Sequence, residues 1–125
     1  MRRALPILLL AITTTFAHRA AMAAPPADVK TKVARIMFVG KQNACDCTRK
    51  TIDASWKALQ AAQGGKSRLP IEELKIDVDR AKVDGYRQKR AFVALPAIYF
   101  LDAAEGVREL LQGEVTEAQV RAVLK

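Results

Sequence analysis

Residues 35–47 read Arg-Ile-Met-Phe-Val-Gly-Lys-Gln-Asn-Ala-Cys-Asp-Cys, and they decide the fold of this 125-residue chain. The apolar run at 35–39, closed by Gly40, is typical of a short buried strand. A polar loop follows the strand, and at its end stand the only two cysteines of the sequence, Cys45 and Cys47. Thiol chemistry in this protein is therefore confined to the stretch just after the first strand.

A helix is expected next, at residues 47–62, because three apolar side chains recur there at helical spacing and form one face. Asp46 stands at the position of an N-cap, where a carboxylate oxygen can accept the free amides of the first turn. The glycine pair at 64–65 ends the helix. The apolar face consists of Ile52, Trp56 and Leu59. We interpret Trp56 as a packing residue of this face.

The middle of the chain predicts a second strand and a second helix. Residues 74–78 alternate apolar and charged side chains, as a half-buried strand does. Asp79 is placed to cap a helix over about 80–90, whose many charges predict a mostly solvent-facing element. Tyr86 is interpreted as one of its solvated side chains.

The C-terminal part predicts a hairpin and a last helix. Strands at 97–101 and 107–112 are close enough in sequence to pair in antiparallel. Gly113 ends the second of them, and a helix opens near Thr116. The complete order is strand–helix–strand–helix–strand–strand–helix. The right-handed crossover rule then predicts an α/β domain with a mixed four-stranded sheet flanked by helices.

The N-terminus has the pattern of a secretory signal peptide. A basic start is followed by a short apolar run and by small residues suited to cleavage after Ala23. The run is shorter than the roughly 20 residues that span a bilayer. We therefore expect a signal peptide at 1–23, a flexible lead-in at 24–34, and one domain at 35–125. The expected location is periplasmic or secreted, with membrane attachment only through an uncleaved signal.

Cleavage changes the charge balance and removes the only histidine, His18. The 21 basic residues of the chain fall to 18 against 13 acidic ones, a net charge of +5. Basic and acidic residues alternate along the remainder, so the charge does not indicate nucleic-acid binding. No cofactor motif is present, and we expect none to be required.

The order of elements, with a cysteine pair between the first strand and the first helix, resembles the thioredoxin-like family of thiol–disulfide oxidoreductases. Leu95-Pro96-Ala97 stands just before the third strand, where that family places a cis-proline beside its active-site cysteines. Gly113 matches a family glycine, and Lys75–Asp79 resembles the second core strand with its acidic turn. The resemblance covers about residues 35–125. It departs from the family in its motif, which is C-x-C in place of C-x-x-C.

The resemblance implies that Cys45 is the attacking thiol and Cys47 the resolving one. A thiolate near a helix N-terminus is stabilised by the unpaired amides there. Arg49 and Lys50 are expected to lower the thiol pKa further, and Asp46 to oppose them. A disulfide within C-x-C closes a smaller ring, and the strain predicts a bias toward isomerase or oxidase activity.

The resemblance also assigns Leu95 and Pro96 to substrate binding. Pro96 is expected to be cis and to leave the backbone of Leu95 free to pair with a substrate chain. The expected partners are exported proteins with thiols or disulfides, together with an electron donor or acceptor.

Two other functions are compatible with the sequence. Two thiolates one residue apart could bind Cu(I), which accepts soft sulfur ligands at low coordination number. Zinc is less suited, because a closed zinc site requires four ligands. The second alternative is a non-catalytic thioredoxin-like module that makes protein contacts.

Overall fold

The computed structural model describes residues 32–64 and 68–125. The predicted signal peptide at 1–23 and most of the predicted lead-in lie outside these residues. Within the two described ranges, no helix is both long enough and apolar enough to cross a membrane.

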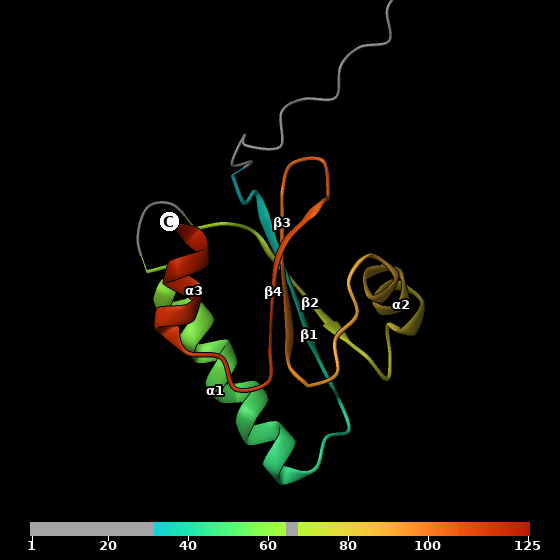
Figure 1. Ribbon diagram of the computed structural model, residues 1–125. Helices are drawn as coiled ribbons and strands as arrows, with labels where there is room; N and C mark the ends of the chain where they lie inside the picture. Colours follow the sequence, from blue (N-terminus) through green and yellow to red (C-terminus); the bar gives the residue numbers. More distant parts are fainter. Residues whose placement is uncertain (1–31, 65–67) are drawn as a thin grey trace, which may run out of the picture.

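The centre of the domain is an open four-stranded sheet with the order β2-β1-β3-β4 (Figure 1). β1 pairs in parallel with β2 and in antiparallel with β3, which pairs in antiparallel with β4. This mixed sheet is the one that the sequence predicts. The strands are β1 Arg35–Gly40, β2 Ile71–Lys75, β3 Ala97–Leu101 and β4 Val107–Gln112.

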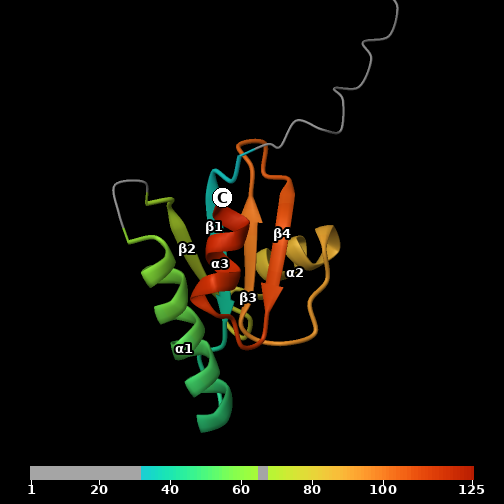
Figure 2. The same cartoon turned by 60° about the vertical axis from the view of Figure 1, so that its left-hand side comes forward.

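Within residues 32–64 and 68–125, three helices cover the two faces of the sheet. α1 and α3 lie side by side on one face, and α2 lies on the other (Figures 1 and 2). The fold is thus α/β with a thioredoxin-like layout, as predicted. The helices are α1 Asp46–Ala62, α2 Arg80–Lys89 and α3 Glu117–Leu124.

The alternation of side chains along β1 divides the core into two layers. Ile36 and Phe38 point toward α1 and α3, while Met37 and Val39 point toward α2. All four are almost completely buried, because β1 is an inner strand covered on both faces. A continuous apolar run is what such a strand requires.

β2 lies three residues earlier than the predicted strand at 74–78, which was therefore wrong in its bounds. Its ladder with β1 runs from the Pro70 carbonyl, which accepts Ile36 N–H, to Ile76 N–H, which donates to the Gly40 carbonyl. β1 ends at Gly40, so the following residues have no strand to pair with. They turn instead, and the Asp79 carboxylate accepts the Lys75 amide at 2.9 Å.

The prediction for Tyr86 was also wrong, because its side chain is half-buried. It lies one helical turn from Val83, which is fully buried, so it faces the sheet. Its ring centroid lies 5.4 Å from that of Tyr99, and its hydroxyl accepts a hydrogen bond from Arg35. Burial raises the pKa of Tyr99, whose hydroxyl donates to the Arg90 carbonyl.

A buried serine joins α1 to the start of α3. The Ser55 hydroxyl donates to the Gly113 carbonyl at 3.2 Å and accepts the Val115 amide at 3.1 Å. Gly113 has φ +75°, a conformation that side chains rarely adopt, which explains the glycine after β4. Thr116 then caps α3 through a capping box with Gln119.

Candidate functional site

Cys45 is the N-cap residue of α1. Its backbone is extended, with φ −64° and ψ 162°, and its carbonyl accepts the first helical hydrogen bond, from Arg49 N–H at 2.9 Å. Asp46 was predicted to hold this position, but it is the first helical residue. The Cys45 thiol stands where a capping oxygen usually does, beside the free amides of the first turn, but it makes no capping hydrogen bond.

The Cys45 thiol forms a hydrogen bond with the side chain of Thr48. The Thr48 Oγ1 lies 3.2 Å from the Cys45 Sγ, within hydrogen-bonding distance for sulfur. This hydroxyl is the main cause that lowers the pKa of Cys45, and the Thr48 backbone amide is the next. Both stabilise the thiolate, which is the reactive form. The thiol is also exposed, so a disulfide substrate can reach it.

Replacing Thr48 with valine is expected to raise the pKa of Cys45 and to slow its alkylation several-fold at neutral pH. Valine keeps the branched shape but removes the hydroxyl that stabilises the thiolate. The measurement is the rate of reaction with iodoacetamide between pH 5 and 10, in a Cys47→Ser background. Thr48→Ser keeps the hydroxyl and serves as the control. An unchanged pH profile in Thr48→Val would show that the hydroxyl does not act on the sulfur.

Cys47 is exposed and is the second residue of the helix. Residues two apart on a helix point to different sides, whereas residues three apart are neighbours. Thr48, and not Cys47, accordingly meets the Cys45 sulfur. Both cysteines are free thiols in this structure. The resolving role of Cys47 stays a prediction.

Three residues near Cys45 were predicted to tune its thiol pKa. Among the described residues, none of the three forms a hydrogen bond with the Cys45 sulfur. Arg49 donates to the Ala44 carbonyl at 3.0 Å, which ties the helix to the loop before Cys45. Asp46 and Lys50 are exposed. The lowered pKa of Cys45 is accounted for by Thr48 and nearby backbone amides. Tuning by Asp46, Arg49 and Lys50 stays a prediction.

Asp77 holds the loop that leads to Cys45. Its two carboxylate oxygens accept the backbone amides of Gln42 and Asn43, each at 2.9 Å. These two hydrogen bonds lower the pKa of Asp77, and the bond from the Gln42 amide has the larger effect. The turn after β2 is thereby joined to the loop after β1, and sequence reasoning missed this connection.

The Asp77 anchor predicts a specific pH dependence. Because its pKa is lower in the folded chain than its ordinary value of 3.8, the anchor contributes fully above that value. Its contribution is lost as the pH falls through the folded pKa. Asp77→Asn is therefore expected to lower the urea midpoint at pH 7, and the difference from the parent should shrink in acid. Asp84→Asn, at an exposed carboxylate, is the control; a pH-independent difference would refute the anchor.

Leu95 and Pro96 lie at the same end of the sheet as the cysteine loop. The peptide bond between them is cis, as predicted. Val39 pairs with Ala97, so the residue before β3 lies beside the end of β1. Pro96 is buried, and its carbonyl accepts Gly113 N–H. The Leu95 backbone makes no hydrogen bond to another described residue.

The described part of the chain contains no cluster of three or more histidine, cysteine or acidic side chains that could hold a metal ion. The soft ligands at this site are the two exposed thiols of Cys45 and Cys47. No protein-family profile, curated protein or solved structure matches the chain.

Proposed function

We propose that this chain is an exported thiol–disulfide exchange protein and that Cys45 is its attacking thiol. The observation that carries the proposal is the exposed Cys45 thiol at the helix N-cap, with the Thr48 hydroxyl 3.2 Å from its sulfur. The lowered pKa makes this sulfur a better nucleophile at neutral pH than an ordinary thiol. Export is supported by the sequence pattern at 1–23.

In the first step the Cys45 thiolate attacks one sulfur of a substrate disulfide. A mixed disulfide forms between Cys45 and the substrate, and the other substrate sulfur leaves as a thiolate and takes a proton from water. A second thiolate of the substrate then attacks the substrate sulfur of the mixed disulfide. Cys45 is released as the thiolate, and the substrate has exchanged one disulfide for another without net oxidation.

This isomerisation needs only one thiol. That requirement suits a site where the Cys45 sulfur contacts the Thr48 hydroxyl. Cys47 would resolve a stalled mixed disulfide by attacking the Cys45 sulfur, which releases the substrate sulfur as a thiolate and leaves a disulfide between Cys45 and Cys47. Oxidation or reduction of substrates would additionally need a partner that exchanges electrons with the pair. The free backbone of Leu95 beside the cis-proline is suited to hold an extended substrate segment.

The test is capture of substrates by the Cys47→Ser variant in an extract of exported proteins. Without Cys47, mixed disulfides on Cys45 should accumulate, and a reducing agent should release the captured proteins. Cys45→Ser is the matched control and should capture little, although it keeps the other exposed thiol. Equal capture by both variants would show that the site has no preference for Cys45. Copper bound stoichiometrically to the reduced parent protein, and lost in Cys45→Ser, would favour the metal function instead.

A further inference from the structure

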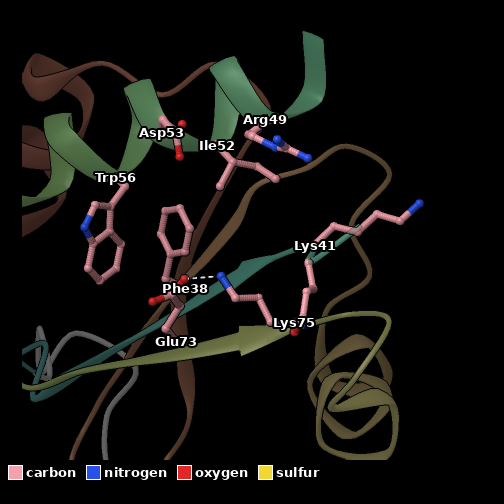
Figure 3. A pocket seen from close by; sticks show the side chains of 9 residues that line it. Phe38, Lys41, Arg49, Ile52, Asp53, Trp56, Glu73 and Lys75 are labelled. Carbon is pink, nitrogen blue, oxygen red and sulfur yellow. Dashed lines mark hydrogen bonds and ion pairs between the residues drawn. The ribbon is translucent and has the colours of Figure 1, made fainter. Parts of the chain in front are cut away.

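A groove lies between α1 and the outer strand of the sheet, β2. Its volume is about 500 Å³, within the range of small ligand sites. Figure 3 shows Trp56 at one end, Phe38 in the middle, and Lys41 and Arg49 at the other end. The groove is separate from the Cys45 sulfur, which does not line it.

The wall formed by β2 is a sheet edge with unpaired backbone groups. Pro70 and Ile76 bond to β1 at the two ends of the ladder, so alternate residues of β2 face β1. The residues between them, Ile71 and Glu73, direct their N–H and C=O groups outward. No other described strand pairs with this edge. Such an edge can accept a further strand.

The floor of the groove is apolar and aromatic. Phe38 and Ile52 are buried, and the Trp56 ring stands edge-on to Phe38 at a centroid distance of 4.9 Å. Trp56 is only half-buried, so part of the indole faces the groove. This floor suits one apolar side chain of a bound segment.

The end of the groove next to the cysteine loop is positively charged. Lys41 and Arg49 are exposed, and neither forms an ion pair with another described residue. Lys75 is paired with Glu73 (Figure 3). Lys41 acts beyond ion-pair distance on the Asp77 carboxylate, whose two oxygens are held by backbone amides. Asp53 lies one helical turn beyond Arg49, away from the loop. The charge at the loop end therefore complements a carboxylate.

We propose that this α1–β2 groove binds an extended segment of a partner protein as an additional strand on β2. The segment carries an apolar side chain that covers Phe38 and Trp56. Two residues along, on the same face of the segment, it carries a carboxylate that pairs with Lys41 and Arg49. Residues two apart on a strand share a face, so both contacts are made by one segment.

A second copy of this chain fits the edge less well. Twofold antiparallel pairing centred on Glu72 or on Glu73 would place two carboxylates directly opposite each other. Like charges at such positions destabilise a strand pair. The acidic edge thus favours a different protein as the occupant.

Trp56 is the only tryptophan of the chain, so its fluorescence reports on the groove. The probe is a blocked five-residue peptide with leucine second, glutamate fourth and threonine elsewhere. We expect it to change the emission of Trp56 saturably in the full chain carrying Cys45→Ser and Cys47→Ser. Because both thiols are absent, the result does not depend on the proposed exchange activity. A peptide with lysine in place of glutamate should bind about tenfold more weakly.

Two variants of β2 test the added strand. Glu73→Pro removes the outward N–H but leaves the ladder with β1 intact, since proline is tolerated where its nitrogen faces away from the sheet. It should abolish binding, whereas Glu73→Ala keeps the N–H and should retain it. The double variant Lys41→Glu, Arg49→Glu should reverse the preference between the two peptides. Circular dichroism confirms that each variant is folded.

Four results of the binding and emission experiments would overturn the proposal. The first is that the peptide causes no saturable change in Trp56 emission, and the second is that both peptides bind equally. The third is that the peptide still binds to the Glu73→Pro variant. The fourth is that, without peptide, the emission spectrum depends on protein concentration. The last result would assign the groove to a second copy. Slow hydrogen exchange of the Glu73 amide in the peptide-free monomer would assign the edge to this chain's own residues, and would equally exclude a partner.

Discussion

Replacing Cys45 with serine is expected to lower the initial rate of disulfide exchange several-fold, to the slower rate of the remaining thiol of Cys47. The reaction requires a thiolate, and a serine hydroxyl is not deprotonated at neutral pH. Cys47 remains in this variant, but it lacks the contact with Thr48 that lowers the pKa of Cys45. The measurement is the attack on an aromatic disulfide whose released thiol is coloured, followed in the first seconds.

The comparison variant is Cys47→Ser, which should keep the rate of this first step within a few-fold of the parent. The defect of this variant should appear only in the later step, as slower release of mixed disulfides. If both variants lose the first step equally, the two sulfurs act together and the separate roles given to them are wrong. If Cys47→Ser alone loses it, the attacking thiol is Cys47.

Replacing Phe38 with alanine is expected to destabilise the fold by about 4 kcal/mol. The Phe38 ring is fully buried on the inner strand β1 and packs edge-on against Trp56. Alanine would leave a cavity between the sheet and α1, because a strand bonded on both sides cannot move to fill it. Urea unfolding monitored by circular dichroism measures the change.

Val93→Ala is the control for this substitution, since the Val93 side chain is 95% exposed. Its effect should stay within about 0.5 kcal/mol. A loss below about 1.5 kcal/mol in Phe38→Ala would mean that the core layer beside α1 repacks freely. The groove and the helix bearing Cys45 would then not be held on a rigid support.

Local periodicity was sufficient to predict most of the fold. β1, β3 and β4 are each an apolar or alternating run bounded by a turn residue, and these were predicted to within one residue. β2 was misplaced because alternation continues through Ile76 into the turn. β2 ends where its partner β1 ends, at Gly40. The local sequence pattern of β2 contains no information about this pairing.

The candidate site was predicted in its sulfurs but not in the contacts around them. The charges near Cys45 predicted a role for Arg49 and Lys50, whereas the contact that lowers the pKa of Cys45 comes from Thr48. The signal was present in the sequence, because N-cap and third helical residues commonly bond to each other. The prediction of Asp46 as the N-cap residue excluded a contact between Cys45 and Thr48.

Contacts between distant segments could not be predicted. Asp77 binds amides 34 and 35 residues earlier in the chain, and its position depends on where β2 ends. The groove likewise combines α1 with β1, β2 and the loop between β1 and α1. Such sites follow from the register of the sheet, which single-sequence patterns do not specify.

The central claim is that Cys45 is the reactive thiol because Thr48 stabilises its thiolate. Competitive alkylation tests this claim most directly. The reduced parent protein is treated at pH 7 with less than one equivalent of iodoacetamide. Fragment-ion mass spectrometry then assigns the label to one of the two cysteines within the peptide that contains both. We predict that the label is several-fold enriched on Cys45 and that Thr48→Val removes most of this preference. Equal labelling of Cys45 and Cys47 in the parent, or a preference unchanged in Thr48→Val, would contradict the claim.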